Sequence, residues 1–342
     1  MAKHRFLSLL TMSLLLGALL AGCASEGTDG GADAADGDGD AAGTGAGAGS
    51  RPTPRSNDGA ASPSGSDASD EAARWYAYAF DTPVRAKSGG AGKIQEFTFR
   101  STREESAGAT VMDVRVEVLG VTSVPVRTTR MDMTSFESTT VETPVELQRL
   151  RHTITVVSDA SSGRAAGDSA TVDVYVPVDE LQASAHGWFF TKMVWNDGEG
   201  EEHAWEWHVT PAMQSEVDAG RAIYLPFVEG DGSDWWGFDV MATTYGLGVF
   251  SGFATGAQEF SEESFSYGGY SHRTSRETFR IGGYTFDGWS VRTSATTAQG
   301  SGEWSFDVSP DLPVPISYRI GSTGADGSDA VYAYELRDLK LG

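Results

Sequence analysis

Hydrophobic and polar residues alternate along much of the chain from Trp75 onward, with a period of two. Clear examples are residues 94–100, 111–118, 153–157 and 171–178, in which Val, Thr, Tyr and Phe dominate. Turns rich in glycine and serine separate these runs. A period of two with β-branched and aromatic residues is typical of strands that bury one face. The pattern predicts an antiparallel β meander with one dry face and one solvated face.

The same alternation returns after Gln258 and continues to the end of the chain. The candidate strands there are residues 265–270, 278–281, 284–292, 303–308, 314–320 and 331–339. Two prolines exclude a central strand at residues 312–315, because proline has no N–H to donate. About a dozen strands in sequential order predict a mainly β fold, one curved sheet or open half-barrel. The similar Tyr-Ala-Tyr segments at 76–78 and 332–334 suggest that the first and last strands are neighbours.

The middle of the chain predicts one or two helices that plug this half-barrel. Thr210-Pro211 is typical of a helix start, and Gly220 would end the helix after Ala219. Residues 240–258 carry no charge and contain four glycines. A membrane segment, a glycine-rich strand pair and a buried helix all fit, and we favour the buried helix. Its candidate plug or ligand-cavity residues are Tyr245, Leu247, Val249, Phe250 and Phe253.

The first 22 residues have the pattern of a secretory signal peptide, with a short basic start and an apolar run that ends in small residues. The segment Leu20-Ala21-Gly22-Cys23 resembles the lipobox of bacterial and archaeal lipoproteins. That resemblance implies that signal peptidase recognises Leu20, Ala21 and Gly22, and that Cys23, the only cysteine, is lipidated. An ordinary signal peptide with a chance cysteine is the alternative. The resemblance predicts an extracytoplasmic protein anchored to the membrane by its lipid.

Residues 23–70 are predicted to be a disordered tether between this anchor and a β-rich domain at residues 71–342. The tether is built mostly from Gly, Ala, Ser, Asp and Pro and has no aromatic residue after Cys23. As a flexible coil it would reach roughly 35–40 Å. The domain has 272 residues, which is ample for a large core without any disulfide.

The chain is strongly acidic, with 48 Asp and Glu against 25 Lys and Arg and a net charge of −23. The excess lies mostly in the domain, because residues 71–342 alone carry 39 acidic and 21 basic residues. Such a surface repels nucleic acid, so we expect no nucleic-acid partner. The membrane, through the lipid on Cys23, and a hydrophobic small molecule or lipid are the expected partners. The sequence leaves the oligomeric state open.

The last 60 residues or so contain a recognisable series of segments. Gly-Tyr-Thr-Phe-Asp-Gly-Trp-Ser-Val at 283–291 is followed by Glu-Trp-Ser-Phe at 303–306, Ser-Pro-Asp-Leu-Pro-Val-Pro at 309–315 and Tyr-Ala-Tyr-Glu-Leu at 332–336. This series resembles envelope proteins related to the lipoprotein-localisation-factor (LolA/LolB-like) half-barrels. The resemblance implies an open barrel around a helical plug, with an apolar cavity for acyl chains. Residues 240–258 would be the plug.

Candidate chemistry concentrates at residues 201–208, Glu-Glu-His-Ala-Trp-Glu-Trp-His. In a strand, His203 and His208 face opposite sides, and no face carries three metal ligands at a known spacing. A hairpin arm next to an acidic turn at 196–200 is the simpler interpretation. The acidic residues 229–234 lack the length of an EF-hand loop. Trp235 and Trp236, which follow, are candidates for surface contact with a sugar, a partner or a membrane.

Three functions are compatible with these patterns. We favour a non-catalytic binding protein that holds a hydrophobic or acyl-chain ligand in a half-barrel cavity, with no cofactor and no metal. A structural or adhesive surface module that binds a protein or glycan is the second hypothesis. A hydrolase that uses carboxylates in the region Glu199–Glu206 is the third. No nucleophile elbow, phosphate-binding loop or dinucleotide fingerprint is present, which makes an enzyme the minority hypothesis.

Overall fold

The computed structural model describes residues 80, 83–105, 108–160, 164–178, 190–196, 200–230, 260–297, 300–324 and 329–342. All of them belong to one compact unit, Ala68–Gly342. The signal peptide, Cys23, the tether and residues 240–258 lie outside the described residues. The predictions made for those segments therefore stay predictions.

The described part is mainly β, as the alternation predicts. Its elements are β1 (Val84–Arg85), β2 (Ala91–Gly92), β3 (Ile94–Glu105), β4 (Gly108–Asp132), β5 (Ser138–Asp159), β6 (Ser169–Pro177), β7 (Lys192–Asn196), β8 (Glu202–Glu206), α4 (Pro211–Asp218), β9 (Ala222–Glu229), β10 (Glu263–Tyr267), β11 (Tyr270–Ile281), β12 (Tyr284–Thr297), β13 (Gly300–Val308), β14 (Ser317–Gly324) and β15 (Asp329–Leu341).

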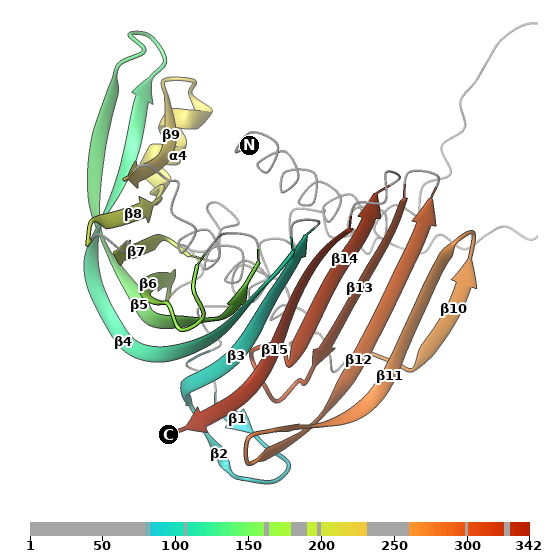
Figure 1. Ribbon diagram of the computed structural model, residues 1–342. Helices are drawn as coiled ribbons and strands as arrows, with labels where there is room; N and C mark the ends of the chain where they lie inside the picture. Colours follow the sequence, from blue (N-terminus) through green and yellow to red (C-terminus); the bar gives the residue numbers. More distant parts are fainter. Residues whose placement is uncertain are drawn as a thin grey trace, which may run out of the picture. The chain divides into compact units, whose positions relative to one another are not determined.

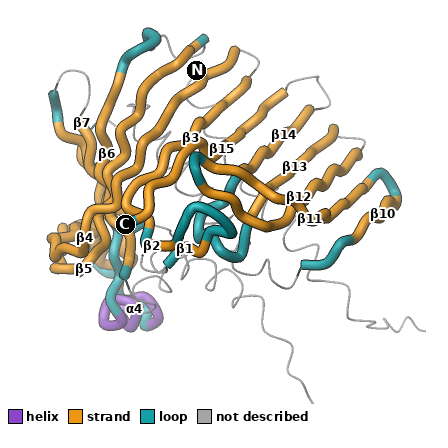
Figure 2. The backbone as a smooth tube through the Cα atoms, turned by 90° about the horizontal axis from the view of Figure 1, so that it is seen from below, coloured by secondary structure: helices purple, strands orange, loops and turns teal. Residues whose placement is uncertain are grey.

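Thirteen of these strands form one antiparallel sheet in the order β10-β11-β12-β13-β14-β15-β3-β4-β5-β6-β7-β8-β9 (Figure 1). β1 and β2 make a separate small pair. In Figure 2 the strands from β10 to β15 follow one another as a row that continues into β3. β10 pairs only with β11 among the described strands, so the sheet as a whole keeps an open edge and does not close into a barrel.

The first long strand and the last strand are neighbours, because β15 pairs along β3 from Ala330↔Glu105 to Leu341↔Ile94. This pairing joins the N-terminal and C-terminal halves into one sheet. β15 thus lies beside the first long strand of the described part, β3. Residues 76–78, which suggested the contact, lie outside the described part.

The opposite end of the sheet folds back on itself. β9 pairs with β8 and also with the distal half of β4, from Thr128↔Pro226 to Asp132↔Ala222. The pairings β4-β5-β6-β7-β8-β9-β4 therefore form a closed circuit, which we call the β4–β9 circuit. β4 can take part in both the sheet and the circuit because it is 25 residues long and carries a bulge between Val118 and Val121.

One face of the sheet, called the inner face here, carries the main hydrophobic core. Its largest fully buried side chains include Tyr334, Phe97, Phe99, Phe190, Phe286, Phe306 and Leu150. Tyr334 stacks on Tyr318 at 5.1 Å between ring centroids and contacts Phe99 at 4.7 Å. Aromatic side chains on neighbouring strands thus form a continuous wall across the inner face, which is worth more than area burial alone.

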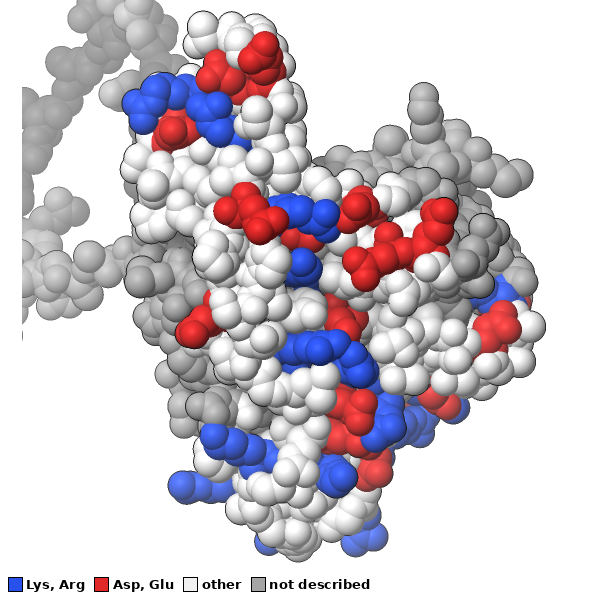
Figure 3. All heavy atoms as spheres, turned by 90° about the vertical axis from the view of Figure 1, so that its left-hand side faces the viewer, with Lys and Arg blue, Asp and Glu red and all other residues white. Residues whose placement is uncertain are grey.

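The outer face is covered by ion pairs between neighbouring strands. Examples are Arg100–Asp113 at 2.7 Å, Arg115–Glu96 at 2.6 Å, Arg151–Asp173 at 2.9 Å, Arg292–Asp307 at 3.0 Å and Arg319–Glu303 at 3.2 Å. Figure 3 shows basic and acidic side chains interspersed over the side of the molecule that faces left in Figure 1. Exposed pairs of this kind add little stability. They keep the outer face solvated.

The predicted helix is present as α4, with the expected boundaries. The hydroxyl of Thr210 accepts a hydrogen bond from the amide of Met213 at 3.3 Å, and Pro211 opens the first turn. Gly220 follows the end of the helix at φ 66°. Met213 packs with Val209, Ala222 and Tyr224 in a small core of the β4–β9 circuit.

Two strand predictions needed correction at their ends. The predicted strand 265–270 is interrupted, because Gly268 and Gly269 form the turn between β10 and β11 at positive φ. The predicted strand 314–320 begins only at Ser317, since Pro313 and Pro315 lie in irregular backbone before β14. The exclusion of a central strand at the two prolines is confirmed.

Candidate functional site

A pocket of about 170 Å³ lies on the inner face near the open edge of the sheet. It is lined by side chains from β10 to β13 and from the segment just before β10: Phe260, Ser261, Glu263, His272, Thr274, Val291, Trp304 and Phe306. Pockets that enclose drug-sized ligands are typically about 300–1,000 Å³. This pocket is therefore suited to a ring-sized group rather than to a whole acyl chain.

Strand register brings the lining together from segments far apart in sequence. It aligns two cross-strand rows over β11, β12 and β13: Thr274, Val291 and Phe306 in the first, and His272, Thr293 and Trp304 in the second. β10 adds Glu263 beside Thr274 and Phe265 beside His272. Directly opposed side chains in antiparallel strands are close neighbours. The register thus creates a small polar cluster beside an aromatic surface.

His272 is the centre of the polar cluster. Its Nδ1 lies 2.9 Å from Thr293 Oγ1, and its Nε2 lies 3.0 Å from Thr274 Oγ1 and 3.2 Å from Glu263 Oε1. Hydroxyl groups can donate or accept, so they suit either tautomer of the imidazole. These contacts from three strands fix the ring plane and leave the carboxylate of Glu263 half exposed at the pocket.

The apolar side of the pocket is aromatic. Trp304 stacks on Phe306 with ring centroids 5.4 Å apart and an angle of 16° between the planes. Phe260 contacts Phe306 at 6.4 Å. Phe265 leans over His272 at 5.2 Å. A flat apolar group could stack here while its hydrogen-bonding substituent meets Glu263 and His272.

Several residues of the predicted cluster at 201–208 are buried, so the cluster is not a surface site. β8 carries it, and β7 with β8 forms the hairpin that the simpler interpretation predicts. His203 and Trp205 point into the main core side, where His203 stacks on Trp195 at 5.6 Å. No group of three His, Cys, Asp or Glu side chains in the described structure is arranged to hold a metal ion.

Glu206 is fully buried and bound by cations from two other strands. Its carboxylate accepts hydrogen bonds from the Arg127 backbone amide at 2.6 Å and from Arg127 Nε and Nη2 at 2.9 and 2.6 Å. Lys192 Nζ lies 3.2 Å from Glu206 Oε1 and donates to the Pro125 carbonyl at 2.9 Å. Burial opposes the charge of Arg127, but hydrogen bonds to Glu206 and Glu229 outweigh it and raise the pKa of this guanidinium.

The Glu206 cluster fastens the β4–β9 circuit. The β4–β9 ladder ends at Thr128↔Pro226, and the next amide of β4, that of Arg127, is bound by Glu206 instead of by a strand. The adjacent His208 amide donates to Thr128 Oγ1 at 3.1 Å, and that hydroxyl donates to the His208 carbonyl at 2.9 Å. The side chains of Glu206 and Thr128 thus bond backbone groups that no neighbouring strand pairs. Their role is structural.

Most of the residues chosen from the sequence for binding lie outside the described part. These are Cys23 with Leu20, Ala21 and Gly22, the plug candidates Tyr245, Leu247, Val249, Phe250 and Phe253, and the surface candidates Trp235 and Trp236. The sequence interpretation missed the pocket at His272, although Glu263-Ser-Phe265 and His272-Arg-Thr274 each put polar and aromatic residues on one face. The missing information was which strands pair, and in which register.

Comparisons with models of known protein families, with curated proteins and with solved structures give no match for this chain. The resemblances to the lipobox and to the LolA/LolB-like half-barrels therefore stay predictions from the sequence. Among the helices of the described residues, none is long and apolar enough to cross a membrane. Function has to be inferred from the fold and the pocket.

Proposed function

We propose that this protein is a lipid-anchored binding protein of the cell envelope, which holds a small hydrophobic ligand on the inner face of its sheet. The pocket between Glu263, His272, Trp304 and Phe306 is the observation that carries the proposal. Stacking on Trp304 and Phe306 would supply affinity, and the cluster around His272 would orient a polar substituent. The ion-paired outer face offers no comparable apolar surface.

The proposed lipid anchor is inferred from the sequence around Cys23, and it also predicts where in the cell the protein lies. A signal peptide followed by Leu20-Ala21-Gly22-Cys23 would send the domain across the membrane and attach it there. Disulfides can form on the expected extracytoplasmic side. A chain with one cysteine can make none within itself, so the stability of this fold comes from its large aromatic core.

The size of this pocket narrows the ligand that we propose for it to a compact group. A compact aromatic or alicyclic group with a hydrogen-bonding substituent matches the size of the pocket and its mixed lining. A hydrolytic role for Glu206 has no support in the geometry, because its carboxylate is 0 % exposed and is occupied by Arg127 and Lys192.

Ligand binding is tested first with 1-naphthol, an aromatic alcohol of suitable size, by isothermal titration calorimetry on the full chain carrying Cys23→Ser. We expect measurable binding that Trp304→Ala weakens about tenfold or more, since an aromatic stacking surface is lost. Trp207→Ala is the matched control, because Trp207 is also half-buried but lies after β8 and does not line the pocket.

Equal affinity in the wild-type protein and the Trp304→Ala variant would show that the pocket is not the binding site. Absence of binding, together with a native mass spectrum free of any copurified small molecule, would argue for the adhesive module instead. Thermal denaturation of both variants separates a loss of binding from a loss of folding.

The anchor has its own test in a bacterial host that processes lipoproteins. The mature chain should begin at Cys23, carry a covalent lipid mass and sediment with membranes. Cys23→Ser should remove the lipid mass and the mature N-terminus at residue 23. A mature N-terminus elsewhere, or an unmodified Cys23, would contradict the lipobox prediction.

A further inference from the structure

The distal end of the β4–β9 circuit displays an unusual concentration of exposed apolar side chains. Six of the ten exposed large hydrophobic residues in the described part lie on the β4–β5 turn, on α4 or on β9. Val228 lies near the end of β9 that pairs with β8, and the other five lie toward the turn: Met133, Phe136, Val217, Ile223 and Leu225. We call this group the apolar tip. Scattered apolar residues on a surface need no explanation, but a cluster at a protruding turn is typical of a contact surface.

Strand pairing places part of the apolar tip on one side. Ile223 lies opposite Met131, and Leu225 lies opposite Thr129, on the side of β9 that faces away from the buried Tyr224. The amide of Met133 donates to the Arg221 carbonyl at 3.0 Å, which joins the turn to the start of β9. The turn and β9 therefore present their apolar side chains from neighbouring backbone segments.

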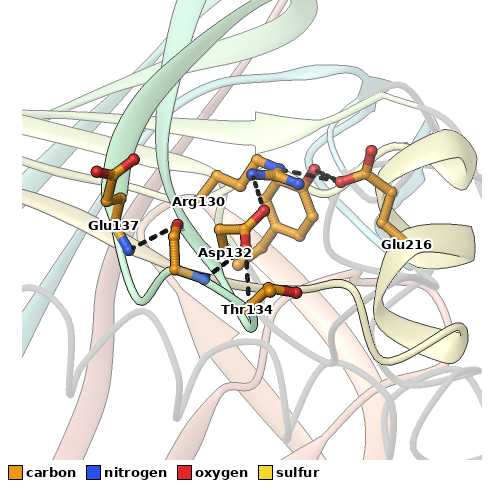
Figure 4. A network of polar contacts seen from close by, with 7 residues as sticks. Arg130, Asp132, Thr134, Glu137 and Glu216 are labelled. Carbon is orange, nitrogen blue, oxygen red and sulfur yellow. Dashed lines mark hydrogen bonds and ion pairs between the residues drawn. The ribbon is translucent and has the colours of Figure 1, made fainter.

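A network of polar contacts holds this end of the circuit in place (Figure 4). Arg130 Nε lies 3.0 Å from Glu216 Oε2, to which the Tyr224 hydroxyl also donates at 2.8 Å. Asp132 Oδ1 accepts from the amides of Ser135 and Thr134 at 3.0 and 2.8 Å, and these bonds lower the pKa of Asp132. The network joins β4, α4, β9 and the turn, so the tip is ordered rather than a loose loop.

Phe136 is the most unusual residue of the tip. It is 70 % exposed, and its φ of 59° is the only positive value of a non-glycine residue in the described structure. A residue with a Cβ pays a conformational cost there that glycine avoids. The turn thus holds a large aromatic ring in water at a position that favours glycine. A cost of this kind at an exposed site points to a function for the ring.

The charges around the tip indicate which surface it can meet. Two basic residues, Arg130 and Arg221, are outnumbered by four acidic ones: Asp132, Glu137, Glu216 and Asp218. An anionic lipid surface would be repelled by this balance, whereas a zwitterionic surface would not. An aromatic ring with aliphatic neighbours can enter the boundary between headgroups and acyl chains without crossing the bilayer.

We propose that the apolar tip docks the domain onto a zwitterionic lipid surface, with Phe136 inserted between the headgroups. The biological use of this contact rests on the proposed anchor at Cys23. An anchored domain meets the membrane at high effective concentration, so a weak contact is sufficient. The contact would fix the orientation of the domain relative to the bilayer, which the tether alone leaves free.

Vesicle flotation tests the contact apart from the anchor when the mature chain, residues 23–342, carries Cys23→Ser, because this protein has neither an acyl group nor the apolar run of the signal peptide. We expect this protein to float with dioleoyl-phosphatidylcholine vesicles, and Phe136→Gly to reduce the bound fraction about tenfold. Glycine suits the backbone of residue 136, so this variant should melt at the same temperature as the parent or higher. Tyr267→Ser is the control, since Tyr267 is an exposed aromatic residue on β10.

The other outcomes overturn the proposal. Absence of flotation would exclude lipid as the occupant and leave a protein partner. Flotation that Phe136→Gly leaves unchanged would show that the protein meets lipid elsewhere than at the apolar tip, which also overturns the proposal. Stronger binding to phosphatidylglycerol vesicles than to neutral ones would contradict the charge argument. A nitroxide attached at Thr134→Cys should lose accessibility to a water-soluble relaxing agent on vesicles, while one at Ser264→Cys should not. Neither result depends on whether Cys23 is acylated or whether the pocket binds 1-naphthol.

Discussion

Replacing Glu206 by glutamine should lower the free energy of unfolding by about 3–5 kcal/mol, the usual cost of removing one partner from a buried ion pair. The carboxylate lies inside the β4–β9 circuit, where Arg127 and Lys192 depend on it. Glutamine keeps the length of the side chain, but its amide group adds donors where only acceptors are needed. Urea denaturation at neutral pH, followed by circular dichroism, measures the change.

A matched exposed pair shows whether the effect comes from burial. Glu303 pairs with Arg319 at 3.2 Å on the outer face, and its side chain is 59 % exposed. Glu303→Gln should cost less than about 1 kcal/mol. If the two glutamine variants lose similar free energies of unfolding, the Glu206 cluster does not stabilise the β4–β9 circuit in the way that its geometry indicates.

The double variant Glu206→Leu with Arg127→Met gives a further check. Replacing a whole buried pair by apolar side chains is often neutral or stabilising, so this protein should be more stable than either single variant. Loss of the Arg127 backbone contact to Glu206 would still leave one amide of β4 without its acceptor. The double variant is therefore expected to remain somewhat less stable than the wild type.

The alternation of residues was sufficient to predict the fold class and most of the strands. Val114 and Val116 alternate with Asp113 and Arg115 in β4, and the structure buries the first pair in the core and puts the second in ion pairs. α4 could be predicted with its boundaries, because Thr210-Pro211 and Gly220 are local signals that do not depend on distant contacts.

The β4–β9 circuit could not be predicted in the same way. It depends on the bulge between Val118 and Val121. On the two sides of this bulge, β4 and β5 bury opposite faces: Leu150 belongs to the main core, whereas Leu147 belongs to a separate small core. A bulge leaves only a weak signal in one sequence, here Gly120 within a β-branched run. The local sequence therefore offers Glu206 only as a candidate catalytic carboxylate, whereas the structure pairs it with Arg127 on a strand almost 80 residues away.

The pocket shows the same limit for function. Glu263, His272 and Trp304 lie on three strands, and their relation follows from the register of three successive hairpins. A shift by one residue would turn His272 to the outer face, so the chemistry of the site depends on register rather than on any local motif. The anchor, by contrast, is predicted from a local motif, because Leu20, Ala21, Gly22 and Cys23 are consecutive in the sequence.

Acid should destabilise this protein between about pH 6.5 and pH 4, because of one buried histidine, His152. His152 on β5 is 1 % exposed, and neither ring nitrogen has a hydrogen-bond partner among the described residues. Its neighbours across the sheet are Val116 and Val172. Burial lowers the pKa of His152 to about 4, and the attraction of Asp173 on β6 opposes this only in part.

The sign follows from comparing the folded and unfolded chains. The unfolded chain binds a proton near pH 6.5, whereas folded His152 stays neutral until about pH 4. The contribution of neutral, buried His152 to the free energy of unfolding is thus complete above pH 6.5, and it is lost as the pH falls toward 4. A shift of this size corresponds to about 3 kcal/mol. Burial raises the pKa of Asp173, but hydrogen bonds from Arg151 and Arg149 outweigh it and lower that pKa, so this carboxyl titrates below the window.

His152→Leu separates this effect from all other titrations. Leucine has a similar volume and no polar atom, so the variant should gain about 1–3 kcal/mol at pH 7 by removing an unsatisfied buried group. Its advantage over the wild type should then grow by about 3 kcal/mol between pH 6.5 and 4. Urea denaturation of both proteins at several pH values measures the difference directly. A constant difference across that range would mean that His152 finds a partner when it is protonated, and that the inner face is less dry at β5 than its burial indicates.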